Sequence, residues 1–181
     1  VYQYASSTWS QLGSDIDGEA AGDYSGCSVF LSGDGTTVAI GSTHNDNANT
    51  DAGHVRVYQY ASSTWSQLGS DIDGEATWDG SGFAVSLSDD GTIVAIGAKD
   101  NDGGGTNSGH VRVYQYASST WSQLGSDIDG EAASDNSGCS VSLSSDGTIV
   151  AIGAYSNDGN GSSSGHVRVY QYASSTWSQL G

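Results

Sequence analysis

The sequence predicts an all-β protein built from repeated four-stranded units, and three observations lead to this prediction. The segment VYQYASSTWSQLGSDIDGEA begins at Val1, Val57 and Val113 without one change, so the repeat period is 56 residues. Within each unit, apolar residues alternate with small or polar ones over short, β-branched runs. Gly or Asp-Gly interrupts these runs at close intervals, and none of them has the 3.6-residue spacing of an amphipathic helix.

The repeats also set the organisation of the chain. The first thirteen residues of the repeated segment occur a fourth time at 169–181. We therefore predict one repeat array over residues 1–181, with units at about 14–69, 70–125 and 126–181 and a partial unit at 1–13.

The first two strands of each unit are predicted to form a hairpin. In the first unit, Val29 and Leu31 follow the period of two that is typical of a strand. The Asp-Gly pair that comes next is a strong hairpin signal, because both of its residues can take positive φ. The first strands are Ser28–Ser32, Ala84–Ser88 and Ser140–Ser144, the Asp-Gly pairs lie at 34–35, 90–91 and 146–147, and the second strands are Thr37–Gly41, Ile93–Gly97 and Ile149–Gly153.

The second half of each unit is predicted to add two more strands. A polar, Gly-rich loop leads to a third strand at His54–Tyr60, with equivalents in the other units. Ala-Ser-Ser-Thr then makes the next turn. The fourth strands are expected at Trp9–Ile16, Trp65–Ile72 and Trp121–Ile128.

Four antiparallel strands in a unit of this length are typical of a β-propeller blade. A β-solenoid or a stacked-sheet filament is the alternative, although such folds are usually built from shorter coils. Propellers close with about four to eight blades, and three units fall short of that number. Three arrangements stay open: a piece of a longer array, a six-bladed ring made by two copies, and units that stack into a fibre.

The segment SGCSVSLSSDGTIVAIGAYSNDGNGSSSGHVRVY, Ser137–Tyr170, resembles the FG-GAP repeat family. Members of this family form the blades of integrin α-subunit propellers and occur in many secreted bacterial and algal proteins. The resemblance recurs in every unit: the FG position reads Ser-Gly, and the GAP position keeps its Gly but lacks Pro. These glycines are Gly26, Gly82 and Gly138 at the first position and Gly41, Gly97 and Gly153 at the second. The resemblance implies a propeller blade that often binds calcium and is usually extracellular or at the cell surface.

The composition excludes several classes of partner. The chain has 4 Lys+Arg against 21 Asp+Glu and a formal net charge of −17, so we expect it to bind no nucleic acid. It is equally unsuited to an anionic membrane surface, and no apolar stretch is long enough for membrane insertion. Cys27 and Cys139 occupy equivalent positions two units apart, so we expect two small buried thiols rather than a disulfide.

The loop between the second and third strands is the first candidate calcium site. It is rich in Asp, Asn and Gly, which suits an ion that takes six to eight oxygen ligands. One position is acidic in every unit: Asp46, Asp102 and Asp158. The alternative is a solvated loop in which these side chains bind only water and backbone. Asn160 begins an N-glycosylation sequon in the same loop, which would be usable in a secreted protein.

A second acidic cluster follows the fourth strand and is the other candidate calcium site. Carboxylates at i, i+2 and i+4 of an extended segment share one face, which is unfavourable unless a cation or hydrogen-bond donors compensate. The alternative is an inter-blade turn whose Asp side chains cap backbone N–H groups. Arg56, Arg112 and Arg168 could each pair with one of these carboxylates. The residues are Asp15, Asp17, Asp71, Asp73, Asp127 and Asp129, with Glu19, Glu75 and Glu131 next and Asp23, Asp79 and Asp135 downstream.

The histidines and aromatic residues have structural interpretations. His54, His110 and His166 begin the third strands and are expected to be hydrogen bonded, because residues on separate blades do not converge on one zinc ion unless they face a common axis. The repeated Tyr pairs and Trp are expected to pack between blades, and sugar stacking is the alternative. Residues present in one unit only are candidate ligand contacts: His44, Trp78, Lys99 and Tyr155.

The sequence contains no recognisable catalytic constellation, and any catalytic group in the repeats would occur in three copies, so we expect no enzyme activity. The leading hypothesis is an extracellular structural protein that self-associates into an oligomer, filament or matrix. The alternative is a calcium-dependent adhesion module that binds a glycan or a cell-surface ligand.

Overall fold

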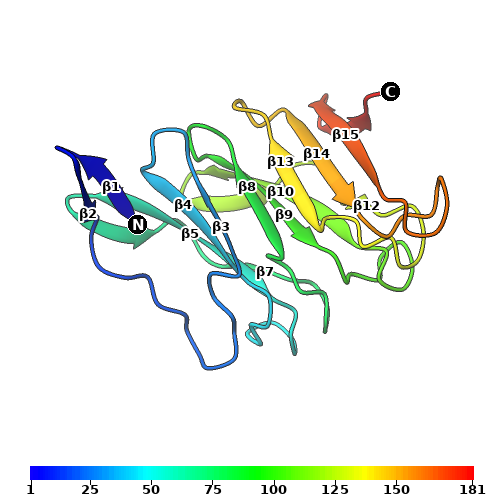
Figure 1. Ribbon diagram of the computed structural model, residues 1–181, viewed down its shortest axis with the longest axis horizontal. Coiled ribbons are helices and arrows are strands. Elements are labelled where there is room, and N and C mark those ends of the chain that lie inside the picture. Colours follow the sequence, from blue (N-terminus) through cyan, green and yellow to red (C-terminus); the bar gives the residue numbers. More distant parts are fainter.

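The computed structural model describes residues 1–181 and contains sixteen β-strands and no helix. The chain begins with a separate hairpin of β1 (Tyr2–Ala5) and β2 (Thr8–Gln11). Three antiparallel sheets follow in sequence order (Figure 1). The strands are β3 (Ser28–Leu31), β4 (Thr37–Ser42), β5 (His54–Ala61), β6 (Thr64–Gln67), β7 (Ile72–Asp73), β8 (Ala84–Leu87), β9 (Ile93–Ala98), β10 (His110–Ala117), β11 (Thr120–Gln123), β12 (Ile128–Asp129), β13 (Ser140–Leu143), β14 (Ile149–Ala154), β15 (His166–Ala173) and β16 (Thr176–Gln179).

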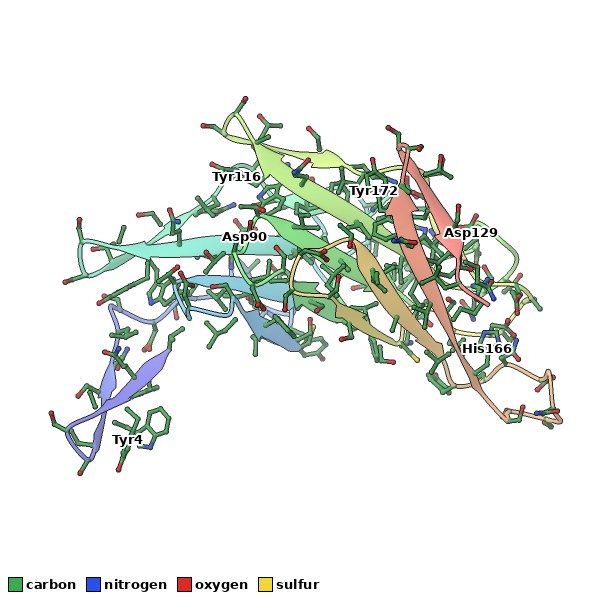
Figure 2. All side chains as sticks on the ribbon, turned by 90° about the horizontal axis from the view of Figure 1, so that it is seen from above. Tyr4, Asp90, Tyr116, Asp129, His166 and Tyr172 are labelled. Atoms are coloured by element: carbon green, nitrogen blue, oxygen red, sulfur yellow. The ribbon has the colours of Figure 1, made fainter.

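Each sheet is one blade with four main strands in sequence order, which confirms the predicted all-β fold of four-stranded antiparallel units. We call β3–β7 blade 1, β8–β12 blade 2 and β13–β16 blade 3. The first strands of neighbouring blades, β3, β8 and β13, contact one another. The blades form an open arc with the two chain ends far apart (Figure 1). The hairpin that carries Tyr4 projects away from the three sheets (Figure 2).

The predicted fourth strand from Trp65 to Ile72 is wrong as a continuous element. Strand β6 ends at Gln67, and β7 then pairs with the start of β5, where Ile72 lies opposite Val55. The interruption lies at Gly69, whose φ of 70° departs from extended backbone. A Cβ on Gly69 would lie 3.0 Å from the indole ring of Trp121 in the next blade, so inter-blade packing favours Gly here.

The two kinds of hairpin turn also differ from expectation. In the Asp-Gly turns only Gly has positive φ, while the Asp34 side chain accepts hydrogen bonds from the Thr36 N–H and the Ser32 hydroxyl. The turn with two positive φ values is instead Ser-Ser, with 51° at Ser62 and 66° at Ser63. This conformation resembles a type I′ turn, in which Asn-Gly is the preferred pair. The Ser-Ser turn recurs at residues 6–7, 118–119 and 174–175.

The core lies between blades rather than within them. We call the side of a blade that faces the preceding unit its front face, and the side that faces the following unit its back face. In blade 2 the front face consists of Val85, Leu87, Val94 and Ile96, which pack on Ala39, Val55 and Val57 of the back face of blade 1. The back face of blade 2, with Ala95, Val111 and Val113, packs in the same way on Val150 and Ile152 of blade 3.

The glycines of the repeat motif meet across these interfaces. Gly138 has φ of 86°, which favours Gly, and its carbonyl oxygen lies where a Cβ on Gly97 would be. Gly82 and Gly41 make the same contact between blades 1 and 2. Two glycines per repeat are therefore required because the backbones of adjacent blades touch.

The outermost faces of the array are only partly covered: on the front face of blade 1, Val38 and Ile40 are 4% and 8% exposed. On the front face of blade 1, Val29 is 63% exposed, whereas the equivalent Val85 is 6% exposed. On the back face of blade 3, Val167 is 66% exposed, whereas the equivalent Val111 is fully buried. Each terminal blade thus presents a face that is core elsewhere in the same molecule.

No helix in the structure has the length and apolar character needed to cross a membrane.

Candidate functional site

Each junction between units gathers titratable side chains from three segments. At the first junction, Glu19 comes from the segment before blade 1, His54 begins β5, and Asp71 lies between β6 and β7. Their ligand atoms all lie within 4.8 Å of one another. The second junction repeats the arrangement with Glu75, His110 and Asp127. A third group consists of Glu131, Asp135 and His166.

The histidines at the first two junctions are buried and lack hydrogen bonds at Nδ1. The side chain of His54 is 1% exposed, and its Nδ1 lies 3.7 Å from Asp71 Oδ2 and 3.9 Å from Glu19 Oε2. These separations are too long for hydrogen bonds, and neither ring nitrogen of His54 has another partner. His110 Nδ1 is equally unpartnered and lies 3.8 Å from Asp127 Oδ2. The expectation of hydrogen-bonded histidines is therefore wrong for these ring nitrogens.

Burial sets the charge of these histidines. It lowers the pKa of His54, and the nearby Asp71 and Glu19 carboxylates only partly oppose this effect. Burial likewise lowers the pKa of His110, and the Arg112 guanidinium adds to the effect. Both imidazoles are therefore neutral at pH 7, the state in which histidine binds metal ions.

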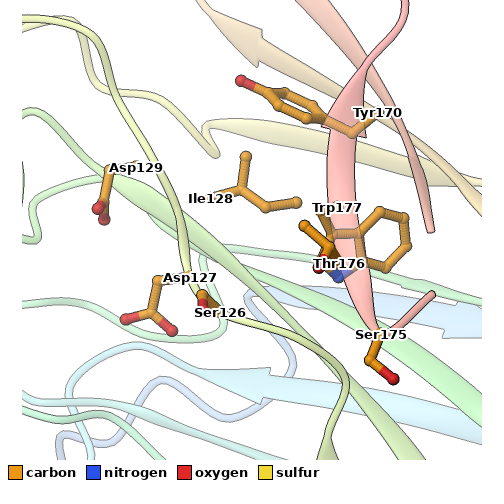
Figure 3. Close-up of a pocket in the computed structure, with 8 residues that line it drawn as sticks. All are labelled: Ser126, Asp127, Ile128, Asp129, Tyr170, Ser175, Thr176 and Trp177. Atoms are coloured by element: carbon orange, nitrogen blue, oxygen red, sulfur yellow. The ribbon is translucent and has the colours of Figure 1, made fainter. Parts of the chain in front are cut away.

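The acidic segment after the fourth strand is extended at Ile128–Asp129, the conformation in which alternate carboxylates share one face. Figure 3 shows Asp127 and Asp129 on one side of the chain, while Ile128 points to the other side, toward Tyr170 and Trp177. At the preceding junction, burial raises the pKa of Asp73, and repulsion from Asp71 raises it further. The carboxylates two residues apart therefore do repel one another.

Each repeated arginine binds the acidic segment that precedes its blade. The Arg56 guanidinium donates a hydrogen bond of 2.8 Å to the carbonyl oxygen of Asp17 and lies 3.7 Å from Glu19 Oε1. In the second junction, Arg112 lies 3.1 Å from Glu75 Oε1. The partner of each arginine is thus the Glu of the cluster, and the Asp contributes only its backbone. One Glu oxygen faces Arg while the other faces His at the first junction.

The loop carboxylates serve as backbone caps. Asp46, Asp102 and Asp158 are exposed, and each accepts at Oδ1 a hydrogen bond from a backbone N–H five residues ahead. These bonds are 2.6 to 2.7 Å long. None of the three belongs to the junction clusters, although the neighbouring Asn47 donates a hydrogen bond to Glu19 of the first cluster.

A buried Asp–Asn pair holds each loop to the segment before it, and sequence reasoning did not identify this pair. Asn45 donates to Asp23 over 3.0 Å, and the same Asp23 oxygen accepts the Ala20 N–H. The pairs Asp79–Asn101 and Asp135–Asn157 are equivalent. The recurrence of Asn at 45, 101 and 157 was the available signal.

The repeated aromatic residues pack between units, as expected. Trp121 Nε1 donates a hydrogen bond of 2.7 Å to the carbonyl oxygen of Leu68 in the preceding unit, and Trp65 and Trp177 make equivalent bonds. Each Trp also contacts a Tyr ring from the same hairpin, including Tyr116 and Tyr172 at the periphery of blades 2 and 3 (Figure 2). Trp9, in the N-terminal hairpin, is 66% exposed.

Three of the four residues that occur in one unit only lie together. His44, Trp78 and Lys99 line a hollow of about 140 Å³ between blades 1 and 2. Lys99 Nζ lies over the Phe83 ring and 2.6 Å from Asp100 Oδ2. Tyr155, the fourth, is exposed on blade 3.

The two thiols are free and lie in separate blades. Cys27 is exposed and Cys139 is half-buried, so the expectation of two buried thiols is wrong. Cys27 is the more open of the two. It immediately precedes β3, the strand that carries the exposed Val29 of the uncovered front face.

Comparisons with known proteins agree with this architecture. A family model for the FG-GAP repeat matches residues 127–170. The curated proteins include no match to this chain. Among solved structures, the β-propeller domain of Cps50 (Swd1) from Myceliophteria thermophila is 10% identical with a TM-score of 0.52, and the match covers 91% of this chain and 41% of that one.

Two further structures show the same likeness. A candidate 6-phosphogluconolactonase from Bacteroides uniformis is 12% identical with a TM-score of 0.55, over 84% of this chain and 37% of that one. Hydrazine synthase from Kuenenia stuttgartiensis is 12% identical with a TM-score of 0.51, over 92% and 38%. The chain therefore spans less than half the length of these structures, and the likeness concerns the fold alone. Residues 127–170 match the FG-GAP repeat, and residues 1–181 have the fold of consecutive β-propeller blades.

Proposed function

We propose that the protein is a non-catalytic structural module of the cell exterior whose copies join head to tail. The observation that carries this proposal is the pair of uncovered faces. Val29 on the front face of blade 1 and Val167 on the back face of blade 3 are 63% and 66% exposed. Contiguous apolar surface of this kind marks an interaction site.

A second copy of the chain is the occupant that fits both faces. A front face already packs on a back face twice within the molecule, so the two uncovered faces are complementary by construction. Because the contact joins different surfaces, it is heterologous, and it generates either a closed ring or a filament. Two copies would supply six blades, which lies within the range of about four to eight that propellers use.

For two copies to associate, the last hairpin of one copy must replace the N-terminal hairpin of the other. The N-terminal hairpin lies beside blade 1, where Leu12 accepts the hydrogen bond of Trp65. The last hairpin of a second copy would need the same place, and residues 169–181 are identical in sequence to residues 1–13. Exchange between identical hairpins therefore preserves every contact with blade 1 while it connects two copies.

The test uses two variants that each block one face. Val29→Asp blocks the front face and Val167→Asp the back face, and both residues are already exposed, so neither change disturbs the monomer core. Each variant alone is expected to sediment as a monomer where the wild type associates. An equimolar mixture should form dimers and stop there, because only one front face and one back face remain compatible.

Ser122→Asp, at an exposed site on β11, is the matched control and should associate like the wild type. A monomeric wild type at millimolar concentration would exclude the proposal. Self-association of Val167→Asp alone would instead indicate a symmetric contact between front faces.

The location outside the cell is supported by the FG-GAP repeat, which is typical of extracellular and surface proteins. Calcium is the corresponding proposal for the acidic loops. The Oδ2 atoms of Asp46, Asp102 and Asp158 accept no hydrogen bond within the chain and are exposed, although one repeated carboxylate per loop is a small share of the ligands that calcium requires.

A binding module is the second candidate function, and the hollow at Trp78 favours it. An exposed indole beside Lys99 and His44 offers stacking and hydrogen bonds to a small polar ligand such as a sugar. A glycan screen followed by Trp78→Ala would test this function. Retained binding in that variant would exclude the hollow as the site.

A further inference from the structure

We propose that each complete blade junction is a binding site for one divalent transition metal ion of the zinc type. The ligands are one Glu oxygen, one His Nδ1 and one Asp oxygen from three separate segments. The complete sites are Glu19–His54–Asp71 and Glu75–His110–Asp127. Neither site uses the loop residues Asp46, Asp102 and Asp158.

The separations between the ligand atoms suit such an ion. Zinc binds histidine nitrogen and carboxylate oxygen at about 2.0 to 2.2 Å, so two of its ligand atoms lie no more than about 4.4 Å apart. The Nδ1 atom of His54 lies 3.7 Å from the Asp71 oxygen and 3.9 Å from the Glu19 oxygen. At the second junction the His110–Asp127 separation is 3.8 Å. The remaining pairs of ligand atoms lie within 4.8 Å of one another, so a small side-chain movement would bring each set to the spacing of zinc ligands.

The unpartnered histidines are an independent observation that points to a ligand. His54 and His110 are 0% and 1% exposed, and the Nδ1 atom of each faces the carboxylates without a hydrogen bond. A buried polar group without a partner costs about 1–3 kcal/mol. A buried imidazole whose unpartnered nitrogen faces carboxylate oxygens is arranged as one member of a set of metal ligands.

The type of ligand selects the class of metal. Imidazole nitrogen combined with carboxylate oxygen suits zinc, cobalt, nickel and copper, whereas calcium prefers oxygen ligands throughout. The carboxylates give access from solvent, since the side chains of Asp71 and Asp127 are 24% and 31% exposed. Three protein ligands leave room for water on the ion.

The group in blade 3 is not equivalent to the other two. In the complete sites the Asp follows the His by seventeen residues, as in His54 and Asp71. The third group contains Asp135 instead, which is buried and already accepts hydrogen bonds from Asn157 and the Ala132 N–H. His166 is also more open, with 25% of its side chain exposed. The 181-residue chain is therefore expected to bind two ions tightly rather than three.

An ion at these sites would hold the segment before a blade against that blade. Glu19 precedes blade 1, His54 begins β5, and Asp71 lies between β6 and β7 of the same blade. Arg56 lies beside Glu19 Oε1, while Glu19 Oε2 faces the histidine and accepts a hydrogen bond of 3.0 Å from Asn47 Nδ2, which an ion would share or replace. The site would hold the connecting segment against β5, where β7 pairs with that strand.

The test is a titration of the metal-free full-length chain with Co²⁺, read by its visible absorption, and with Zn²⁺, read by calorimetry. We expect two equivalents for the wild type, one for His110→Gln, and none of comparable affinity for the double variant His54→Gln/His110→Gln. His44→Gln, which removes an exposed histidine outside the clusters, should retain two. A millimolar excess of Ca²⁺ should leave the cobalt spectrum unchanged.

The double variant Glu19→Gln/Glu75→Gln tests the same sites if the histidine variants fail to fold. Both glutamate side chains are partly exposed, so their replacement should leave the fold intact. This variant should weaken Co²⁺ binding about tenfold or more, the effect typical of changes around a metal ion. Unchanged stoichiometry and affinity in both double variants would overturn the proposal, as would a wild type that binds no Co²⁺. Displacement of Co²⁺ by equimolar Ca²⁺ would overturn the assignment to a transition metal.

Discussion

Blade 2 and blade 3 share four strands with nearly the same residues, yet equivalent residues are buried to different extents. Val111 and His110 are 0% and 1% exposed in blade 2, where a blade packs on each face. In blade 3 the equivalent Val167 lies on the back face, which has no neighbour, and is 66% exposed, and the side chain of the equivalent His166 is 25% exposed. The difference shows that a unit of this protein does not contain its own core, which forms only where two units meet.

The strongest test of this comparison is one substitution made in both blades. Gly97→Ala places a methyl group against the carbonyl of Gly138, a backbone group that can move only if the interface opens. Overpacking of this kind is expected to lower the free energy of unfolding by about 3 kcal/mol or more. Gly153→Ala meets only the Ser140 hydroxyl and Cys139, which can rotate, so its cost should stay below about 1 kcal/mol.

Urea unfolding followed by tryptophan fluorescence measures both variants. Equal losses would contradict the view that the interface, rather than the strand itself, requires Gly. Gly153→Ala should also weaken head-to-tail association, because Gly153 would then face Gly26 of a second copy. A variant with normal monomer stability and impaired association would sharpen the comparison further.

Substitutions within a single turn should change the stability of every blade by the same amount. The Ser-Ser turns provide this second test. Ser62→Asn/Ser63→Gly supplies the residues that a turn with two positive φ values prefers. The change should stabilise blade 1 by about 1 kcal/mol. Ser174→Asn/Ser175→Gly should give a similar gain in blade 3, because the same pair of positive φ values recurs there, 50° at Ser174 and 64° at Ser175. A gain confined to one blade, measured by the same urea unfolding, would argue against a purely local effect.

The smallest expected effect is the loss of folding stability in acid that comes from Asp146. Hydrogen bonds from the Ser144 hydroxyl and the Thr148 N–H lower the pKa of Asp146 to about 2. The folded pKa is thus below the unfolded value of about 3.9, so the stabilisation is present above pH 4 and is lost as the pH falls toward 2. Asp146→Asn should reduce the difference between the unfolding midpoints at pH 5 and pH 2.5. An unchanged difference would exclude this contribution.

The pKa of Asp34 and of Asp90 is lowered by the same kind of turn. Asp34→Asn should therefore act in blade 1 as Asp146→Asn acts in blade 3.

The elements that the sequence predicted well depend on local information. The strand pairs around Asp34-Gly35 follow from a period of two and a turn signal, and the structure reproduces them within one or two residues. The interruption at Gly69 was not predictable in this way, because it reflects an indole from the next blade. The type of each turn was also missed, since Ser has no intrinsic preference for positive φ.

The candidate site was likewise only partly predictable from the sequence, because it depends on contacts between distant segments. Asp71 and Asp127 were among the residues singled out, but the histidines that face them were assigned a structural role. Glu19 and His54 are thirty-five residues apart and meet only because the acidic segment before a blade lies beside the third strand of that blade. The period of the repeat identifies which residues are equivalent, and it does not reveal which equivalent residues from different units touch.

The hydrogen bonds between blades are the same at each junction, and this sameness affects how the chain folds. Trp121 bonds to Leu68, and Trp177 bonds to Leu124, through segments with the same sequence. A newly formed hairpin can therefore dock on any exposed acceptor with native-like geometry, including one that belongs to another unit. Contacts alone do not distinguish correct from displaced pairing, so the short connection between units must do so by favouring the nearest partner. Dilution during refolding should then raise the yield of correctly ordered blades, since it removes acceptors on other molecules while it leaves the tethered ones in place.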